Sequence, residues 1–229
     1  MIHDDSLPTR RGILLFAASL PLFAADAEFW NRKAPSQWSS DEVDRLITKS
    51  PWAKEITPAA PQSGAGRGRA GRGSPTGGAG SAPYRGIVRW ESAKPVLEAM
   101  KADLPGEFAN HYVISVSGIP SSSSRSLPNA EQTDAESRAS QRESEGVLER
   151  IKGLTYLESI GARSTQPGIV EETPFGVGET RTLLFGFSKA LLPLSLDNKE
   201  VSFTTQIGGT QVKAKYILKE MMYHDELAI

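Results

Sequence analysis

The stretch that decides the fold is Val201–Tyr216, which reads VSFTTQIGGTQVKAKY. Apolar side chains favour the odd positions from 201 to 207 and the even positions from 212 to 216. Alternation with a period of two predicts half-buried strands, and Gly208-Gly209 between them predicts a tight hairpin turn. A two-residue loop fixes the register, so Ile207 should pair with Thr210 and Val201 with Tyr216.

The residues around this hairpin predict further strands and helices in a main domain over 84–229. Strands are expected at Gly86–Trp90, Tyr112–Ile119 and Thr180–Phe187, with a turn at Asp197–Lys199 before the hairpin. A helix capped by Ser92, with Pro95 in its first turn, should join the first two strands. That order suggests a βαβ unit, or a split arrangement with another strand between. The fold class is therefore α+β: an antiparallel meander sheet of three to five strands with two or three helices.

A polar stretch rich in serine, 120–140, should form a mobile loop within this domain. A helix is expected to follow, roughly from Glu136 to Lys152. Val147, Leu148 and Ile151 share a face, whereas the residues before Gly146 are almost all polar. We therefore expect the helix to project at its start and to dock at its end.

An aromatic-rich helical arm, residues 28–61, precedes the main domain. Ser39 and Glu42 have the spacing of a capping box, which predicts a helix from about Asp41 to Lys49 before Pro51 ends it. Trp30, Trp38 and Trp52 flank this helix. These three possible recognition residues either dock the helix on the main domain or form an exposed aromatic surface for a glycan or a partner protein.

Residues 62–83 contain eight Gly and three Arg, with no acidic residue. Such a composition is typical of a flexible linker. A loose tether for an anionic envelope surface is the alternative. The pattern G-x-G-x-x-G at 66–71 lacks a strand before it and a helix after it, so it does not predict a dinucleotide site.

Residues 1–27 have the pattern of a signal peptide. Arg10 and Arg11 precede a short apolar run from Ile13 to Ala25, and the run ends in Ala25-Asp26-Ala27. A dozen apolar residues are too few for a spanning helix, and the small residues predict cleavage after Ala27. The arginine pair resembles a twin-arginine export signal, with the general secretory route as the alternative. We expect an exported protein, periplasmic or extracellular.

Composition excludes several classes of function. Removing residues 1–27 leaves 24 basic and 24 acidic residues, so no net charge attracts nucleic acid. The chain has no cysteine, which excludes disulfides, thiol catalysis and zinc–thiolate sites. The sequence has no second long apolar run, so no integral membrane segment is expected after signal cleavage.

Candidate catalytic and metal-binding groups are sparse, and the sequence predicts no catalytic residue, cofactor or metal. Glu107 and His111 stand four apart, but a strand begins at once after His111. Met221, Met222 and His224 have donor atoms suited to copper, yet adjacent strand residues point to opposite faces. Neighbouring carboxylates such as those of Glu171 and Glu172 mostly mark solvated turns.

Several short pieces are similar to an uncharacterised family of exported acidobacterial proteins with no assigned activity. The pieces are 29–33 (FWNRK), 36–38 (SQW), 50–54 (SPWAK), 88–93 (VRWESA) and 218–223 (LKEMMY). The resemblance covers most of the mature chain and implies export and a shared fold. It supplies no mechanism and no catalytic residues.

The aromatic arm, the tether and the missing catalytic constellation favour one functional hypothesis. It is a non-enzymatic exported module that binds a ligand or an envelope component. The alternative is a hydrolase that acts on an envelope polymer through unidentified carboxylates. A protein that binds a small ligand or a metal is a third hypothesis. The sequence leaves the ligand and the oligomeric state open.

Overall fold

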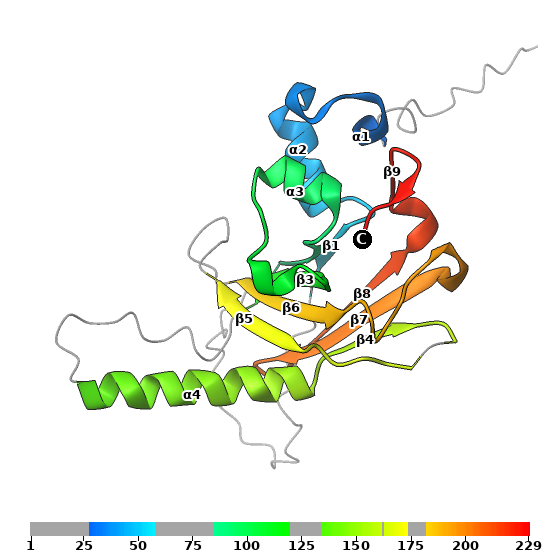
Figure 1. Ribbon diagram of the computed structural model, residues 1–229. Coiled ribbons are helices and arrows are strands. Elements are labelled where there is room, and N and C mark those ends of the chain that lie inside the picture. Colours follow the sequence, from blue (N-terminus) through cyan, green and yellow to red (C-terminus); the bar gives the residue numbers. More distant parts are fainter. Residues whose placement is uncertain (1–27, 58–84, 120–133, 162, 174–181) are drawn as a thin grey trace, which may run out of the picture.

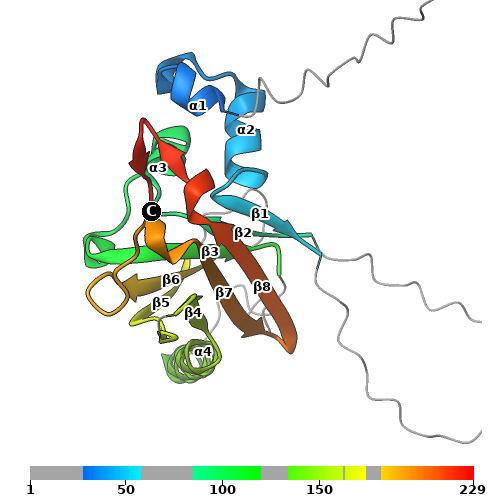
Figure 2. The ribbon, with the colours of Figure 1, turned by 90° about the vertical axis from the view of Figure 1, so that its right-hand side faces the viewer.

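Two antiparallel sheets pack face to face around the core (Figures 1 and 2). The computed structural model describes residues 28–57, 85–119, 134–161, 163–173 and 182–229. The first sheet has the order β1-β2-β3-β6-β5 and the second the order β4-β7-β8. Their bounds are β1 Ala53–Ile56, β2 Gly86–Trp90, β3 His111–Ser117, β4 Tyr156–Ser159, β5 Ile169–Thr173, β6 Thr182–Ser188, β7 Glu200–Ile207 and β8 Thr210–Ile217.

Aromatic side chains join the two sheets. The Phe185 ring of β6 lies 5.4 Å from the Phe203 ring of β7, and the Trp90 ring of β2 lies 5.1 Å from the Tyr216 ring of β8. All four side chains are fully buried. Because apolar burial and aromatic packing dominate such contacts, this interface is the centre of the core.

The predicted hairpin is confirmed in position and register. Strands β7 and β8 pair Ile207 with Thr210 and Val201 with Tyr216. Gly208 and Gly209 adopt φ angles of 55° and 83°, which favour glycine. The residues that point inward are buried along both strands, as the alternation predicts. Together with the helices described below, the antiparallel sheets give the predicted α+β class.

Helices lie at three places around the sheets. The arm forms α1 (Phe29–Arg32), the 3-10 turn η2 (Pro35–Gln37) and α2 (Ser40–Thr48). Helix α3 (Lys94–Met100) follows β2, and α4 (Asp134–Gly153) lies below the sheets in Figure 1. Shorter elements are η3 (Gly106–Phe108), η5 (Leu196–Asn198), η6 (Leu218–Glu220), β9 (Met222–Tyr223) and β10 (Glu226–Leu227).

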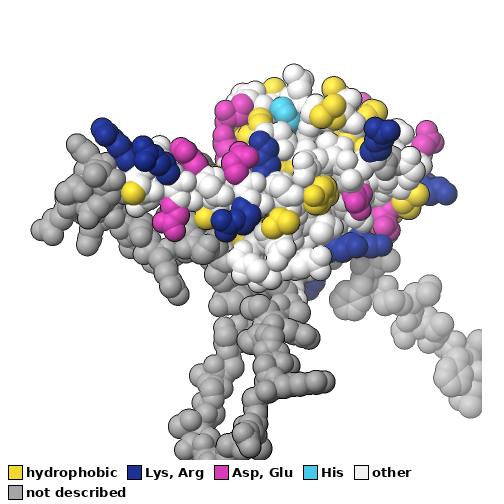
Figure 3. Space-filling model, turned by 90° about the horizontal axis from the view of Figure 1, so that it is seen from below, with side chains coloured by type: hydrophobic (Ala, Val, Ile, Leu, Met, Phe, Trp, Pro, Cys, Tyr) yellow, Lys and Arg dark blue, Asp and Glu magenta, His cyan; other side chains and the backbone are white. Residues whose placement is uncertain are grey.

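Local sequence signals account for two of these helices. Ser39 accepts a hydrogen bond from the Glu42 backbone, and Glu42 accepts one from Ser39, so the predicted capping box of α2 is present. Helix α4 buries Ile151 near its end, while its polar first half extends beyond the sheets. On the side of the molecule seen from below, basic and acidic side chains are interspersed (Figure 3).

Two predictions about the segment between β2 and β3 are corrected, and the structure also decides which sheet contains β6. Strands β2 and β3 are antiparallel neighbours, so neither a βαβ unit nor a split arrangement forms there. Strand β6 does not join the hairpin, because it pairs with β3 and β5 in the other sheet. Ser92 does not cap α3, since its hydroxyl accepts a hydrogen bond from the Val113 N–H instead. The connection over 91–110 is long enough for a crossover, so its length does not distinguish parallel from antiparallel pairing.

Several predictions concern residues outside the described ranges. The signal peptide at 1–27 and the linker at 62–83 lie there, as do residues 58–61 of the arm and 120–133 of the predicted loop. Residues 134–140, however, belong to α4, so helix replaces loop at that end. Within the described ranges, no helix combines the length and apolar character needed to cross a bilayer.

Candidate functional site

The tryptophans of the arm are buried rather than displayed. Trp30 is 5% exposed, Trp38 9% and Trp52 0%, and all three belong to the same core cluster as the two sheets. The Trp30 ring packs edge-on against Phe29 and Trp52, with centroid distances of 5.2 and 5.3 Å. The docking interpretation is therefore favoured, and an exposed aromatic surface made of these rings is not present.

Two of the three indole N–H groups donate a hydrogen bond, and the third has no acceptor. Trp52 donates to the Ala228 carbonyl at 2.7 Å, and Trp38 donates to the Lys33 carbonyl at 3.2 Å. Trp30 Nε1 is buried and has no partner. Buried donors are nearly always paired, so Trp52 and Trp38 fit a structural role and Trp30 calls for an explanation.

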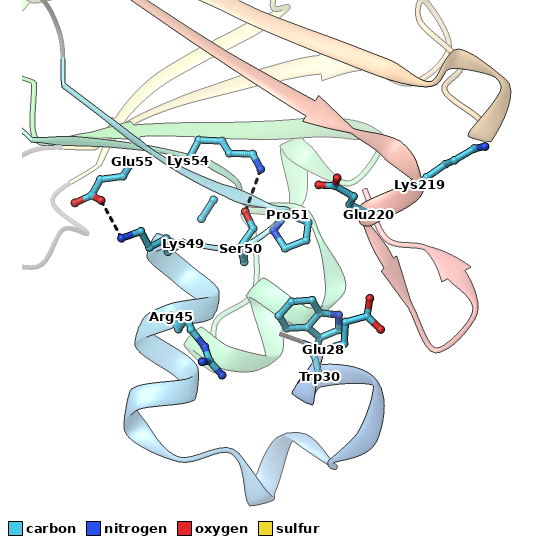
Figure 4. Close-up of a pocket in the computed structure, with 11 residues that line it drawn as sticks. Glu28, Trp30, Arg45, Lys49, Ser50, Pro51, Lys54, Glu55, Lys219 and Glu220 are labelled. Atoms are coloured by element: carbon cyan, nitrogen blue, oxygen red, sulfur yellow. Dashed lines mark hydrogen bonds and ion pairs between the residues drawn. The ribbon is translucent and has the colours of Figure 1, made fainter. Parts of the chain in front are cut away.

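Trp30 also lines an open groove of about 830 Å³ between the arm and the first sheet (Figure 4). The Ser50-Pro51 turn lies in the middle of the groove, and β1 and η6 form its other borders. Eleven residues line it: Glu28, Trp30, Arg45, Lys49, Ser50, Pro51, Ala53, Lys54, Glu55, Lys219 and Glu220. The volume lies within the range of small-ligand pockets.

Strand geometry places Lys54 and Glu55 at this groove. Strand β1 is an edge strand, paired only with β2 in the first sheet. The Ser50-Pro51 turn reverses the chain after α2, and Ser50 and Ala53 exchange backbone hydrogen bonds of 3.2 Å. The turn thus sets β1 beside α2, and the groove forms where the two diverge.

Burial lowers the pKa of Lys54, and attraction to Glu220 opposes that shift. The Lys54 ammonium donates to the Ser50 carbonyl at 3.3 Å. Desolvation disfavours the charged form of a lysine, so an anionic group near Lys54 would stabilise its ammonium form.

The other charges of the groove are held loosely or carry contacts elsewhere. The Lys49 ammonium lies 3.8 Å from the Glu55 carboxylate, and Arg85 lies 3.9 Å from the same carboxylate. The Arg45 guanidinium lies over the Phe29 ring at 5.4 Å. Exposed pairs of this kind contribute little to stability, so Lys49 can exchange its partner at small cost.

The other candidate groups do not assemble into a metal centre. Glu107 lies in η3 and His111 opens β3, so no helix places them on one face. Met221 is buried and Met222 half-buried, in keeping with opposite orientations. Among the described residues, no group of three or more His, Asp or Glu side chains could hold a metal ion.

His224 is exposed but not frayed, although a position near the end of the sequence would predict fraying. It sits in the turn between β9 and β10, and its backbone N–H donates to the Asn31 side chain at 2.9 Å. The C-terminal hairpin therefore closes onto the arm.

Glu171 and Glu172 do not mark a solvated turn, because both lie half-buried on β5. Glu171 also forms an acidic pair that the sequence does not predict. The Glu171 pKa is raised by burial, by repulsion from Glu107 and by a hydrogen bond between the two carboxyls. Glu107 precedes β3, whereas Glu171 lies on β5 at the sheet edge. No local pattern could have found this pair, since its members are distant in sequence.

The sequence does not predict the groove either. Its lining comes from the arm, from β1 and from η6 near the C-terminus, and no motif links these segments. Of the residues considered for recognition, Trp30 alone lines the groove among the three tryptophans. The proline turn at Pro51 was the only local signal that the chain bends there.

Comparison with known proteins gives no match. No family model matches the chain, and no curated protein or solved structure gives a significant similarity. The resemblance to exported acidobacterial proteins therefore stays a prediction.

Proposed function

We propose that the chain is an exported, non-catalytic binding module and that the groove at Trp30 is its ligand site. The observation that carries the proposal is the indole N–H of Trp30. It is a buried donor without a partner, and it belongs to a residue that lines the groove. Because this nitrogen is itself buried, a ligand acceptor in the groove would pair with it only after a shift of the Trp30 ring toward the groove.

Energetics favour a ligand-related role for this donor. An unsatisfied buried donor costs about 1–3 kcal/mol, and the other two tryptophans of the arm avoid that cost. The core groups Trp90 Nε1 and the Tyr216 hydroxyl are also buried without a partner, so it is the position of Trp30 at the groove that sets its donor apart. The groove beside it is open and has the size of a small-ligand pocket.

Export supports an extracytoplasmic ligand. The charged start, short apolar run and Ala25-Asp26-Ala27 end of the N-terminal segment have the signal-peptide pattern. We place the mature protein in the periplasm or outside the cell, with the envelope as the nearest source of ligand. N-terminal sequencing of exported protein should give a start at Glu28, and a start at Met1 would contradict export by this signal.

The binding role is tested by co-sedimentation of the purified protein with an insoluble envelope fraction. Trp30→Phe removes the N–H and keeps an aromatic ring, so we expect the bound fraction to fall at least fivefold. Trp38→Phe is the matched control, because that side chain is also buried in the arm but lies outside the groove. It should leave binding unchanged.

Equal binding by the wild type and Trp30→Phe would contradict this site. Circular dichroism and thermal unfolding of both variants show whether each is folded. Trp30→Phe breaks no hydrogen bond within the described structure, so a folded variant is expected.

A hydrolase remains the second candidate, and one observation favours it. The Glu107–Glu171 pair holds a carboxyl with a raised pKa, as a general acid requires. Hydrolysis of an envelope polymer that is lost in both Glu171→Gln and Glu107→Gln would support it. Activity that survives both changes would exclude this pair as its source.

A further inference from the structure

A buried ion pair lies at the end of β2, close to the arm. The Arg89 guanidinium donates two hydrogen bonds to the Glu91 carboxylate, one from Nε at 2.8 Å and one from Nη2 at 3.1 Å. The Arg89 side chain is 12% exposed and the Glu91 side chain 10%. A two-bonded pair of this kind fixes the orientation of the guanidinium as well as balancing its charge.

Hydrogen bonds extend this pair to two other elements. The Ser115 hydroxyl of β3 donates to the Glu91 carboxylate at 2.8 Å, and Ser115 is itself buried. The Arg89 Nη1 group donates to the Ile47 carbonyl of α2 at 3.3 Å. Because β2 and β3 are interior strands of the first sheet, Arg89 connects a fixed part of that sheet to the arm.

The Ile47 carbonyl lies in the last turn of α2, where helix carbonyls have no partner within the helix. The Ser50 hydroxyl donates to the preceding carbonyl, that of Leu46, at 2.6 Å. Arg89 supplies the donor for Ile47 from a different element, and its positive charge suits the negative end of the helix dipole. The end of α2 is therefore capped from the sheet as well as from its own chain.

The end of α2 is also a border of the groove. Lys49 and the Ser50-Pro51 turn follow the helix directly, and all three residues line the groove (Figure 4). Arg89 does not line it. A shift of the α2 end relative to β2 would move Lys49 and the turn, so Arg89 can affect the shape of the groove without touching a ligand.

Stability alone does not account for this buried pair. Removing two charges from water is costly, and apolar residues of similar volume are often as stabilising as a buried ion pair or more so. The best-attested use of buried ionic groups is to select one arrangement among several. The hydrogen bond to Ile47 is the member of this network that leaves the first sheet, so the arrangement it selects is that of α2 on the sheet.

We infer that Arg89 is a positioning residue of the groove. Glu91 and Ser115 hold its guanidinium, and the guanidinium holds the end of α2 at Ile47. The role in the groove rests on the proposed function, whereas the position of α2 is measurable without a ligand. Local opening of α2 should therefore depend on the network more strongly than global unfolding does.

An apolar replacement separates positioning from stability. Arg89→Met/Glu91→Leu/Ser115→Ala removes the whole network and leaves no buried charge unpaired, so the unfolding temperature should be unchanged or raised. Amide hydrogen exchange over 43–52 should become about tenfold faster, because the end of α2 loses its contact with β2. Exchange over β7 and β8 should not change. Unchanged exchange over 43–52, or equal acceleration in all strands, would overturn the inference.

Arg89→Lys is the conservative variant, and it keeps the inference testable if the triple variant does not fold. It retains the charge beside Glu91, but an ammonium lacks the planar fork that reaches Glu91 and Ile47 together. Exchange over 43–52 should again rise, and exchange as slow as in the wild type would overturn the assignment.

Lys215→Gln/Glu200→Gln is the matched control. Lys215 and Glu200 also form an ion pair between strand residues, at 2.9 Å, but their side chains are 60% and 31% exposed and neither lines the groove. Exchange over 43–52 should stay at the wild-type rate in this variant. Acceleration as large as in Arg89→Lys would overturn a specific role of the buried pair.

Co-sedimentation with the envelope fraction separates this inference from the proposed function. In folded Arg89→Lys protein the bound fraction should fall as exchange over 43–52 rises. Faster exchange with wild-type binding would overturn the role of Arg89 in the groove and leave the proposed site intact. Wild-type protein that does not sediment would overturn the proposed function, and the exchange measurement would still decide whether Arg89 positions α2.

Discussion

Tyr216 lies at the centre of the core with its hydroxyl unpaired. The side chain is fully buried against Trp90, and burial raises the pKa of the phenol far above its usual range. Tyr112 differs, because its hydroxyl accepts a hydrogen bond from the Leu194 N–H at 3.1 Å. Comparing the two tyrosines therefore measures how much a hydrogen-bond partner of a buried hydroxyl contributes to the stability of this core.

Tyr216→Phe should leave the free energy of unfolding unchanged or raise it by about 1 kcal/mol, because an unsatisfied buried hydroxyl is removed. Tyr112→Phe should lower it by about 1 kcal/mol, because a hydrogen bond is lost. Urea unfolding of both variants measures the difference. A Tyr216→Phe protein less stable than Tyr112→Phe would contradict the expectation.

The Glu171 carboxyl should make the stability of the fold depend on pH. Its pKa in the folded state is raised above the unfolded value, chiefly by burial and then by Glu107. The folded state therefore binds more protons between the two pKa values, and stability falls as pH rises through the folded pKa. Glu171→Gln should stabilise the protein at pH 7 and have no effect below about pH 4, where the carboxyl is protonated in both states.

Thermal unfolding between pH 3 and pH 8 follows this effect. Glu107→Gln is the informative comparison, since it removes the second carboxylate of the repelling pair. The gains of the two single changes should not add in the double variant, because both relieve the same repulsion. Full additivity would show that the two carboxyls do not interact.

At the scale of elements, α2 depends on its first turn. Ser39 and Glu42 complete a capping box, and hydrogen bonds from Lys33 and the Ser39 backbone lower the pKa of Glu42. A carboxyl with a lowered pKa stabilises the fold above its unfolded pKa, and this contribution is lost as pH falls through the folded value. The cap also begins the helix that carries Arg45 and that ends at Thr48, just before Lys49, and both basic residues line the groove.

Ser39→Ala should lower the free energy of unfolding by about 1 kcal/mol, because the Glu42 N–H loses its acceptor. Ser40→Ala is the matched control, since its side chain makes no cap hydrogen bond. Chemical denaturation compares the two. A loss as large in Ser40→Ala would contradict the assignment of Ser39 as the cap.

At the scale of the whole molecule, the arm and the main domain form one structural unit. Strand β1 pairs with β2, Trp52 donates to Ala228, and the arm tryptophans share the core of both sheets. The boundary drawn at residues 62–83 therefore separates two parts of the sequence but not two cores. Burial of Trp52 alone should be worth several kcal/mol.

Cutting the chain at a protease site inserted within 62–83 tests this unity. The two fragments should elute as one species in gel filtration, because β1–β2 pairing and the buried tryptophans hold them together. Trp52→Ala in the cut protein should weaken the association, since Trp-to-Ala changes in cores cost about 3–5 kcal/mol. Fragments that separate without denaturant would contradict a shared core.

The elements that the sequence predicted well are those specified by near neighbours. The hairpin register follows from alternation and two glycines, and the α2 cap follows from residues three apart. The short strands β1 and β4 were missed, because four residues carry too little periodicity to stand out. The sheet partners of β6 were not predicted, because an apolar strand has the same pattern in either sheet.

By itself, the sequence determined the α+β class, the β7–β8 hairpin with its register and the capped helix of the arm. Each depends on contacts a few residues apart, whose geometry side-chain order fixes. Only the tertiary structure decided that the tryptophans are buried, that Trp30 lacks a partner and that a groove lined by charges of both signs forms beside it. These features join Glu28, Lys54 and Glu220, and no local rule relates residues so far apart in the chain.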